Sequence, residues 1–182
     1  MDRRHFIESC GASAALLQLA GTMPPFAADA RPVERQPVLL TDAARRPLRA
    51  SSLRPQVNYV FHYPYEATPV FLLDLGRRVP EQTVSMGELR GQYAWPGGVG
   101  PKRSIVAFCA ICSHKLVYPN RDVSFISFRK DRARRGVQNG LIHCCAEHSQ
   151  YDPANGAAVV AGPAPHPLAA VLLRHGPKAD TL

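Results

Sequence analysis

Two short stretches of the chain each place a cysteine close to a histidine. The first is Cys112-Ser113-His114, and the second, thirty residues further on, is Cys145-Ala146-Glu147-His148. Thiolates and imidazoles are the side chains with which proteins bind zinc and iron–sulfur clusters. Two of each make a complete ligand set for either, so the sequence predicts a metal centre.

The division of ligands between the two stretches favours one metal over the other. Zinc fingers usually take a cysteine pair from one segment and a histidine pair from another, whereas here each stretch offers one sulfur and one nitrogen. A 2Fe–2S cluster with two cysteines on one iron and two histidines on the other fits two similar facing loops. The predicted ligands of this cluster are Cys112, His114, Cys145 and His148. A zinc-stabilised β-domain that binds a partner is the alternative of another class.

Two further cysteines, Cys109 and Cys144, stand just before these stretches. Cys144 competes with Cys145 as a ligand, but only Cys145 gives the C-x-x-H spacing. Neighbouring residues on an extended strand point to opposite sides, so we expect Cys109 and Cys144 to point away from the metal and to stay free. A disulfide between them is the alternative in an oxidising compartment.

The elements that must position these residues are predicted to be short strands. Seventeen prolines and 13 glycines in a chain that is 46% apolar favour strands and turns over a helical bundle. The predicted strands are 57–65, 69–75, 103–111, 122–128, 141–144, 156–162 and 168–174, with a loop over 91–101 and a charged turn or short helix over 129–136. The predicted fold class is a small all-β domain whose loops carry the chemistry.

The N-terminus resembles a bacterial export signal. Asp2-Arg3-Arg4-His5-Phe6-Ile7 is similar to the twin-arginine motif of Tat signals, and Ala28-Asp29-Ala30 is a candidate cleavage site. We therefore expect a Tat signal peptide over 1–30, an extended arm over 31–56 and a metal-binding domain over 57–182, in the periplasm. Membrane anchoring is expected only if the signal stays uncleaved, and its apolar stretch is short for a span.

The charge of the mature chain is strongly positive. Residues 1–30 hold two of the 22 basic and three of the 14 acidic residues, which leaves 20 against 11, a net charge of +9. In an exported protein this charge suits docking to an acidic partner or to a membrane surface. The alternative is that the arginines are scattered over the surface and only keep the protein soluble. Nucleic acid is a poor fit as a partner for an exported chain.

A third stretch, Gly162-Pro163-Ala164-Pro165, follows the second one by fourteen residues. Together the three stretches resemble the Rieske family, in which such loops surround a 2Fe–2S cluster. The resemblance implies an antiparallel β-sandwich or barrel with a cluster-binding loop subdomain, and it puts Gly162, Pro163 and Pro165 beside the cluster. It also implies that Ser149 and Tyr151 are hydroxyl donors to sulfur, which raise the reduction potential.

Residues 60–64, 69–80 and 96–108 are similar, more narrowly, to the small Rieske subunit of arsenite oxidase. That resemblance implies an electron-transfer subunit, rather than a stand-alone catalyst, docked on a larger molybdenum-containing catalytic subunit. It would pass single electrons to a cytochrome c or small copper protein. The Rieske subunit of a quinol–cytochrome c reductase, which needs a membrane anchor, is the alternative. The family's loop-to-loop disulfide would fall at Val117 and Glu147, so it is absent here.

Overall fold

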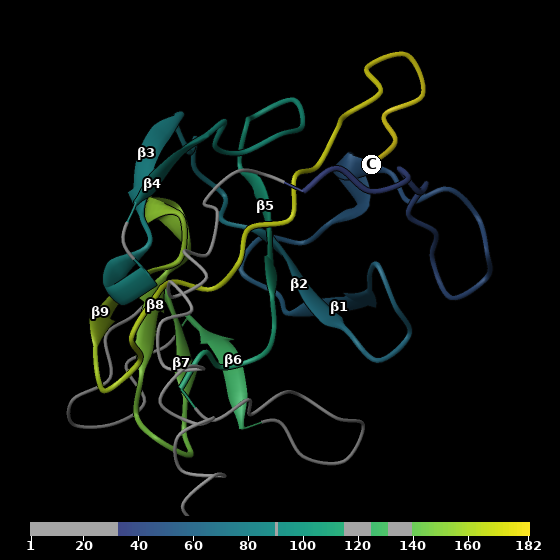
Figure 1. Cartoon of the computed structure of the whole chain (residues 1–182). Coiled ribbons are helices and arrows are strands. Elements are labelled where there is room, and N and C mark those ends of the chain that lie inside the picture. The colour runs from purple at the N-terminus through teal and green to yellow at the C-terminus, as the bar shows by residue number, and fades with distance from the viewer. Residues whose placement is uncertain (1–32, 90, 115–124, 131–139) are drawn as a thin grey trace, which may run out of the picture.

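The computed structural model of the chain describes residues 33–89, 91–114, 125–130 and 140–182. Across these residues the secondary structure is nine strands in three antiparallel sheets, with three short 3-10 helices and no α-helix (Figure 1). The predicted all-β fold class is therefore confirmed. The predicted signal peptide, the residues 131–135 of the basic segment and Val117 lie outside the described residues.

The first sheet has the order β1-β2-β5, with β1 over Tyr59–His62, β2 over Pro69–Asp74 and β5 over Ile105–Cys109. All six residues of β2 are buried, because this strand is central in the sheet and is covered on both faces. The sheet is the scaffold of the first cysteine–histidine stretch, since β5 ends three residues before Cys112.

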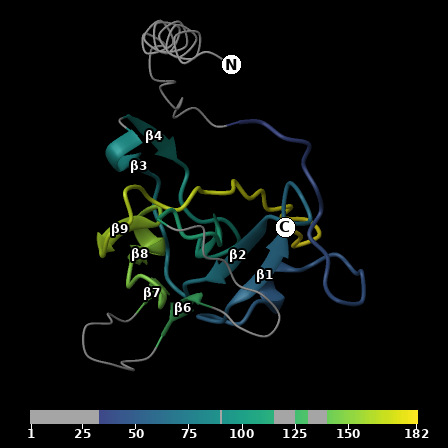
Figure 2. The ribbon, with the colours of Figure 1, turned by 60° about the horizontal axis from the view of Figure 1, so that its bottom comes forward.

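The second sheet has the order β6-β7-β8-β9, with β6 over Ile126–Arg129, β7 over Leu141–Cys144, β8 over Gln150–Asp152 and β9 over Ala158–Ala161. The turn after β7 carries the second cysteine–histidine stretch, and β8 begins directly after it. A register shift between Gln150 and Tyr151 interrupts the pairing of β8 with β9. The four strands lie together on one side of the molecule in two views (Figures 1 and 2).

Two segments differ from the sequence prediction. Residues 92–95, predicted as part of a loop, form β4 (Gln92–Trp95), which pairs with β3 (Gln82–Ser85) in a separate hairpin. The glycines and prolines that suggested a loop all fall at the turn and after Trp95. Residues 168–174, predicted as a strand, run beside β5 with only an isolated bridge between Phe108 and Ala170. Backbone bonds from Cys109 N to Ala169 O and from Val171 N to Ala107 O hold this segment in place.

The main hydrophobic core lies between the first and second sheets and includes two buried cysteines. Phe71 and Phe108 of the first sheet pack there with Ile142 and Tyr151 of the second, and Trp95 of the hairpin joins them. The rings of Trp95 and Phe108 have centroids 5.5 Å apart at an interplanar angle of 47°, a tilted aromatic contact. Two cysteines, Cys112 and Cys144, belong to the same buried cluster.

The segment before β1 packs closely against the C-terminal residues. Leu40, Ala50 and Leu53 are buried with Leu182 in a second core cluster. Backbone bonds join Leu40 N to Leu182 O and Ala50 N to Asp180 O. The arm and the C-terminal segment lie on the opposite side of the first sheet from β6–β9 (Figure 2). No helix long and apolar enough to cross a membrane occurs in the part of the chain that the structure describes.

Asn58, which stands just before β1 of the first sheet, makes two hydrogen bonds to the backbone of β6 in the second sheet. The Asn58 amide donates from Nδ2 to Phe128 O at 3.0 Å and accepts at Oδ1 from Phe128 N at 2.8 Å. Asn58 therefore serves β6 as a partner strand would, on the edge that β7 does not cover. Because β6 pairs with β7 at Ile126 and Cys144, this contact ties the first sheet to the second cysteine stretch.

We predict that Asn58→Ala lowers the free energy of unfolding by about 1–3 kcal/mol, the net value of two partly buried hydrogen bonds. Gln82→Ala is the matched control, because the Gln82 amide makes one such bond, from Nε2 to Ala154 O at 2.9 Å. Urea unfolding of the two variants measures the difference. Equal losses would contradict the bridging role of Asn58.

Candidate metal centre

The two thiols that meet in the core belong to Cys112 and Cys144. Both residues have a relative exposure of 0%, and the two side chains are within hydrogen-bonding contact. Burial raises the pKa of the Cys144 thiol, and the neighbouring Cys112 sulfur raises it further. A pair of buried thiols in contact is a preformed site for a thiophilic metal, because thiolates are the ligands that zinc and iron–sulfur clusters take.

Backbone donors converge on the Cys144 sulfur. The N–H groups of Ala146 and Glu147 both hydrogen-bond to it, and they act to lower the pKa of this thiol. The turn over residues 145–147 is closed by the bond from Cys144 N to Ser149 O at 2.8 Å. Donors aimed at a sulfur stabilise its thiolate form and tune a bound metal.

Cys145, predicted as the ligand, instead faces outward. It is exposed, and its Sγ lies 3.4 Å from Nη2 of Arg129 and 3.6 Å from Nδ1 of His143. Neighbouring positions of β7 point to opposite faces, so Ile142 and Cys144 enter the core while His143 and Cys145 share the other face. The prediction of Cys145 relied on the C-x-x-H spacing, whereas the thiol that enters the core in the structure is that of Cys144.

The remaining spare cysteine, Cys109, lies on β5, opposite Val70 of β2. It is half-buried and free, and Cys144 is free as well, so no disulfide joins the two. Burial raises the pKa of the Cys109 thiol, while a hydrogen bond from the Ile111 backbone lowers it. The expected free state of both cysteines agrees with the structure. Cys144, which was expected to point away from the metal, points into the core next to Cys112.

Tyr151, predicted as a hydroxyl donor, lies against the first sulfur. Its side chain is fully buried, and its hydroxyl is 3.3 Å from Cys112 Sγ and 3.3 Å from Ser113 Oγ. Burial, and then the contact with Cys112, raise the pKa of the phenol. The phenol therefore keeps its proton at any physiological pH and is available as a donor to the sulfur.

Ser149 and His114 each bury a polar atom that has no hydrogen-bond partner among the described residues: Oγ of Ser149 and Nδ1 of His114. An unsatisfied buried group costs about 1–3 kcal/mol. His114 directly follows the Cys112-Ser113 pair, and its side chain is 29% exposed. Both residues lie on the two loops that carry the thiols, and their unpartnered atoms are available to a further group.

The third loop, which begins at Gly162, contacts both of the cysteine-containing loops. Gly162 has φ +88°, and a Cβ on it would lie 2.5 Å from Cα of Ser149, so this position has no room for a side chain. Ser113 Oγ donates to His166 O at 2.8 Å, which fastens the first loop to the end of the third. Pro165 is half-buried and accepts from Glu88 N of η2 (Gly87–Leu89), whereas Pro163 is exposed.

His148, predicted as the fourth ligand, is exposed. Its backbone has φ +59°, and its ring stacks on that of His143, with centroids 6.1 Å apart at 29°. The residue whose side chain approaches His114 is Glu147, with Oε2 4.0 Å from Nδ1. No group of three or more His, Cys, Asp or Glu side chains within holding distance of one ion occurs in the described ranges. The donors instead form two pairs, one of sulfurs and one of nitrogen and oxygen.

These donors fit one half of a 2Fe–2S cluster fully and the other half in part. The thiol pair suits one iron, and the free Nδ1 of His114 suits the second. Residues 112–114 and 144–151 supply all of these groups. Ser113 and Glu147 were not among the predicted site residues, and Cys144 was considered as a ligand but passed over in favour of Cys145. The apolar Ile142 two positions before Cys144 was the signal for its inward direction.

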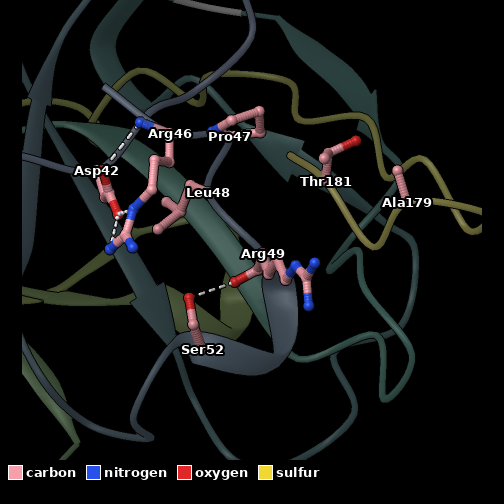
Figure 3. Close-up of a pocket in the computed structure, with 8 residues that line it drawn as sticks. All are labelled: Asp42, Arg46, Pro47, Leu48, Arg49, Ser52, Ala179 and Thr181. Atoms are coloured by element: carbon pink, nitrogen blue, oxygen red, sulfur yellow. Dashed lines mark hydrogen bonds and ion pairs between the residues drawn. The ribbon is translucent and has the colours of Figure 1, made fainter. Parts of the chain in front are cut away.

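A hollow of about 490 Å³ lies away from these loops, between the arm and the C-terminal segment (Figure 3). Its lining residues are Asp42, Arg46, Pro47, Leu48, Arg49, Ser52, Ala179 and Thr181. Asp42 is paired with Arg46, with Oδ2 and Nη2 2.8 Å apart, and the hydroxyl of Ser52 donates to Arg49 O. None of the predicted metal-binding residues lies here.

Known structures include chains that are similar to this one. No family model matches the chain. The chain is similar to the soluble domain of the Rieske protein II (soxF) from Sulfolobus acidocaldarius, with 29% sequence identity and a TM-score of 0.49. The match covers 66% of this chain and 63% of that one.

We predict that Gly162→Ala is clearly more destabilising than Gly140→Ala. Gly140 has φ +75°, and a Cβ on it would meet nothing within 4 Å. Both variants carry the cost of a left-handed backbone, about 1–2 kcal/mol, but only Gly162→Ala also forces the third loop off Ser149, for about 1–3 kcal/mol more. Thermal unfolding of both variants measures this, and equal losses would contradict the close approach of the two loops.

Proposed function

We propose that this chain is a Rieske-type electron-transfer protein whose 2Fe–2S cluster is bound between the loops at 112–114 and 144–151. The observation that carries the proposal is the buried thiol pair of Cys112 and Cys144, with the Tyr151 hydroxyl 3.3 Å from the first sulfur. Bound there, the cluster supplies a group that accepts and releases one electron at a time.

The protein's own groups set the environment of that electron. An added electron makes the sulfurs more negative, and the Tyr151 hydroxyl and the N–H groups of Ala146 and Glu147 are aimed at them. Hydrogen bonds to sulfur stabilise the reduced state and raise the reduction potential. Gly162, packed on Ser149, brings the proline-containing third loop over the second loop, where it limits access of water.

At the level of the complex, we propose an exported small subunit of the arsenite oxidase type. The support is the resemblance of residues 60–64, 69–80 and 96–108 to that subunit, together with the Tat-like N-terminus and the charge of +9 after residue 30. The partner would be a larger molybdenum-containing catalytic subunit, with a cytochrome c or small copper protein as acceptor. A neighbouring gene for a molybdopterin subunit supports this assignment, and one for a cytochrome b points to a quinol–cytochrome c reductase.

We predict that the purified mature protein holds two irons and two acid-labile sulfides, and that Cys144→Ser abolishes this content. Cys145→Ser is the matched control, because the outward thiol next to it is not in contact with Cys112. Iron and sulfide analysis of protein from iron-replete cells provides the test. Full zinc occupancy without sulfide would indicate the zinc-stabilised module instead, and loss of the cluster in Cys145→Ser alone would restore the C-x-x-H assignment.

We also predict that Tyr151→Phe lowers the reduction potential with the cluster still assembled. Loss of one hydrogen bond that strengthens on reduction, at about 0.5–1.5 kcal/mol, corresponds to a shift on the order of 20–60 mV for one electron. Protein-film voltammetry measures the shift, with Tyr93→Phe as a control because Tyr93 Oη has no hydrogen-bond partner in the described part of the chain. Equal potentials in wild type and Tyr151→Phe would contradict the role of the phenol.

A further inference from the structure

The thiol pair accounts for one iron, which leaves open how the other iron is held. His114 supplies one donor, and the second loop offers two adjacent candidates, Glu147 and His148. The spacing rule selects His148, but the structure separates the two side chains. The inference drawn from this separation rests on the proposed function, because it concerns the ligands of the same cluster.

The Glu147 carboxylate lies beside the His114 ring. Its Oε2 is 4.0 Å from Nδ1 of His114, and each side chain is 29% exposed. An imidazole nitrogen and a carboxylate oxygen bound tetrahedrally to one ion at about 2.0–2.2 Å are about 3.3–3.5 Å apart. The observed distance therefore needs to close by only about half an ångström, within the range of a side-chain adjustment.

The backbone around Glu147 also turns toward the sulfur pair. Its N–H donates to Cys144 Sγ, so residue 147 is held at the edge of the site by the same turn that delivers the thiol. The His114 nitrogen that faces it is buried and has no hydrogen-bond partner among the described residues. An imidazole nitrogen without a hydrogen-bond partner beside a carboxylate is an arrangement suited to a shared cation.

His148 is directed away from this point. The residue is exposed, and its φ of +59° is the left-handed conformation in which glycine is usual. Its ring stacks on that of the buried His143, whose side chain lies on the opposite face of β7 from Cys144. His143 in turn contacts the exposed Cys145 sulfur. To bind beside His114, the His148 ring would have to leave this stack.

We propose that Glu147, and not His148, is the partner of His114 on the second iron, so that the centre is bound by Cys112, Cys144, His114 and Glu147. A carboxylate brings one more negative charge than a neutral imidazole. Reduction adds a further negative charge to the cluster, so a centre with Glu147 is harder to reduce than one with two imidazoles. The reduction potential is accordingly lower than that of the Glu147→His variant.

The test counts nitrogen ligands in the reduced, iron-loaded mature protein by electron–nuclear double resonance. We expect one strongly coupled histidine nitrogen in wild type and in His148→Ala, with unchanged iron and sulfide content. Glu147→Ala should lose at least half of its iron. Glu147→His should show a second coupled nitrogen and a higher potential, which a merely structural role of Glu147 does not produce.

Two coupled nitrogens in wild type, one of them lost in His148→Ala, would overturn the Glu147 assignment and leave the proposed function standing. A wild-type protein with neither iron nor labile sulfide, purified from iron-replete cells, would overturn the proposed function and the assignment together. His143→Ala serves as a further control, since it removes the stacking partner of His148 without touching Cys144 or Glu147.

Discussion

The meeting of two thiols from two different sheets is the constraint on which this structure depends. Cys112 follows β5 of the first sheet, and Cys144 ends β7 of the second. Their contact therefore requires that the two sheets pack in one fixed relation. The core between them, with Phe71 and Phe108 on one side and Ile142 on the other, provides that relation. The site is thus a product of the core, and the loops only complete it.

The burial of these polar groups carries a free-energy cost that a bound metal would offset. The loops at 112–114 and 144–151 carry two thiols with 0% exposure, and they carry a histidine nitrogen and a serine hydroxyl that have no hydrogen-bond partner among the described residues. Unsatisfied buried groups oppose folding by about 1–3 kcal/mol each. Under the proposed function, a metal bound to deprotonated thiols and the imidazole would offset that cost, because the binding free energy would be available only in the folded arrangement. Folding of the second loop and loading of the centre would then be coupled.

The sequence predicted the fold class and several of the residues near the buried thiols, and each difference between prediction and structure has a specific cause. The all-β class was predicted from strand patterns and turn residues, which are local signals. The resemblance to the Rieske family implied that Tyr151 lies near sulfur, and its hydroxyl is 3.3 Å from Cys112 Sγ. The choice of Cys145 over Cys144 was based on a spacing rule. Strand alternation determines which thiol enters the core. Cys144 lies two positions after the buried Ile142 and therefore points to the same face of the strand. The hairpin β3–β4 was missed because glycines at its borders outweighed a weakly apolar strand.

The loops around the centre are held without a disulfide, and the structure shows what takes its place. All four cysteines among the described residues are free, and Glu147, where the family resemblance would put one end of the disulfide, faces His114 instead. The third loop supplies the support: Ser113 donates to His166 O, and Gly162 is packed on Ser149. These contacts join all three loops, and they do so by hydrogen bonding and packing that are insensitive to reductant. A glycine at position 162 is the only residue that permits this closeness, since any Cβ would displace the backbone carrying Ser149.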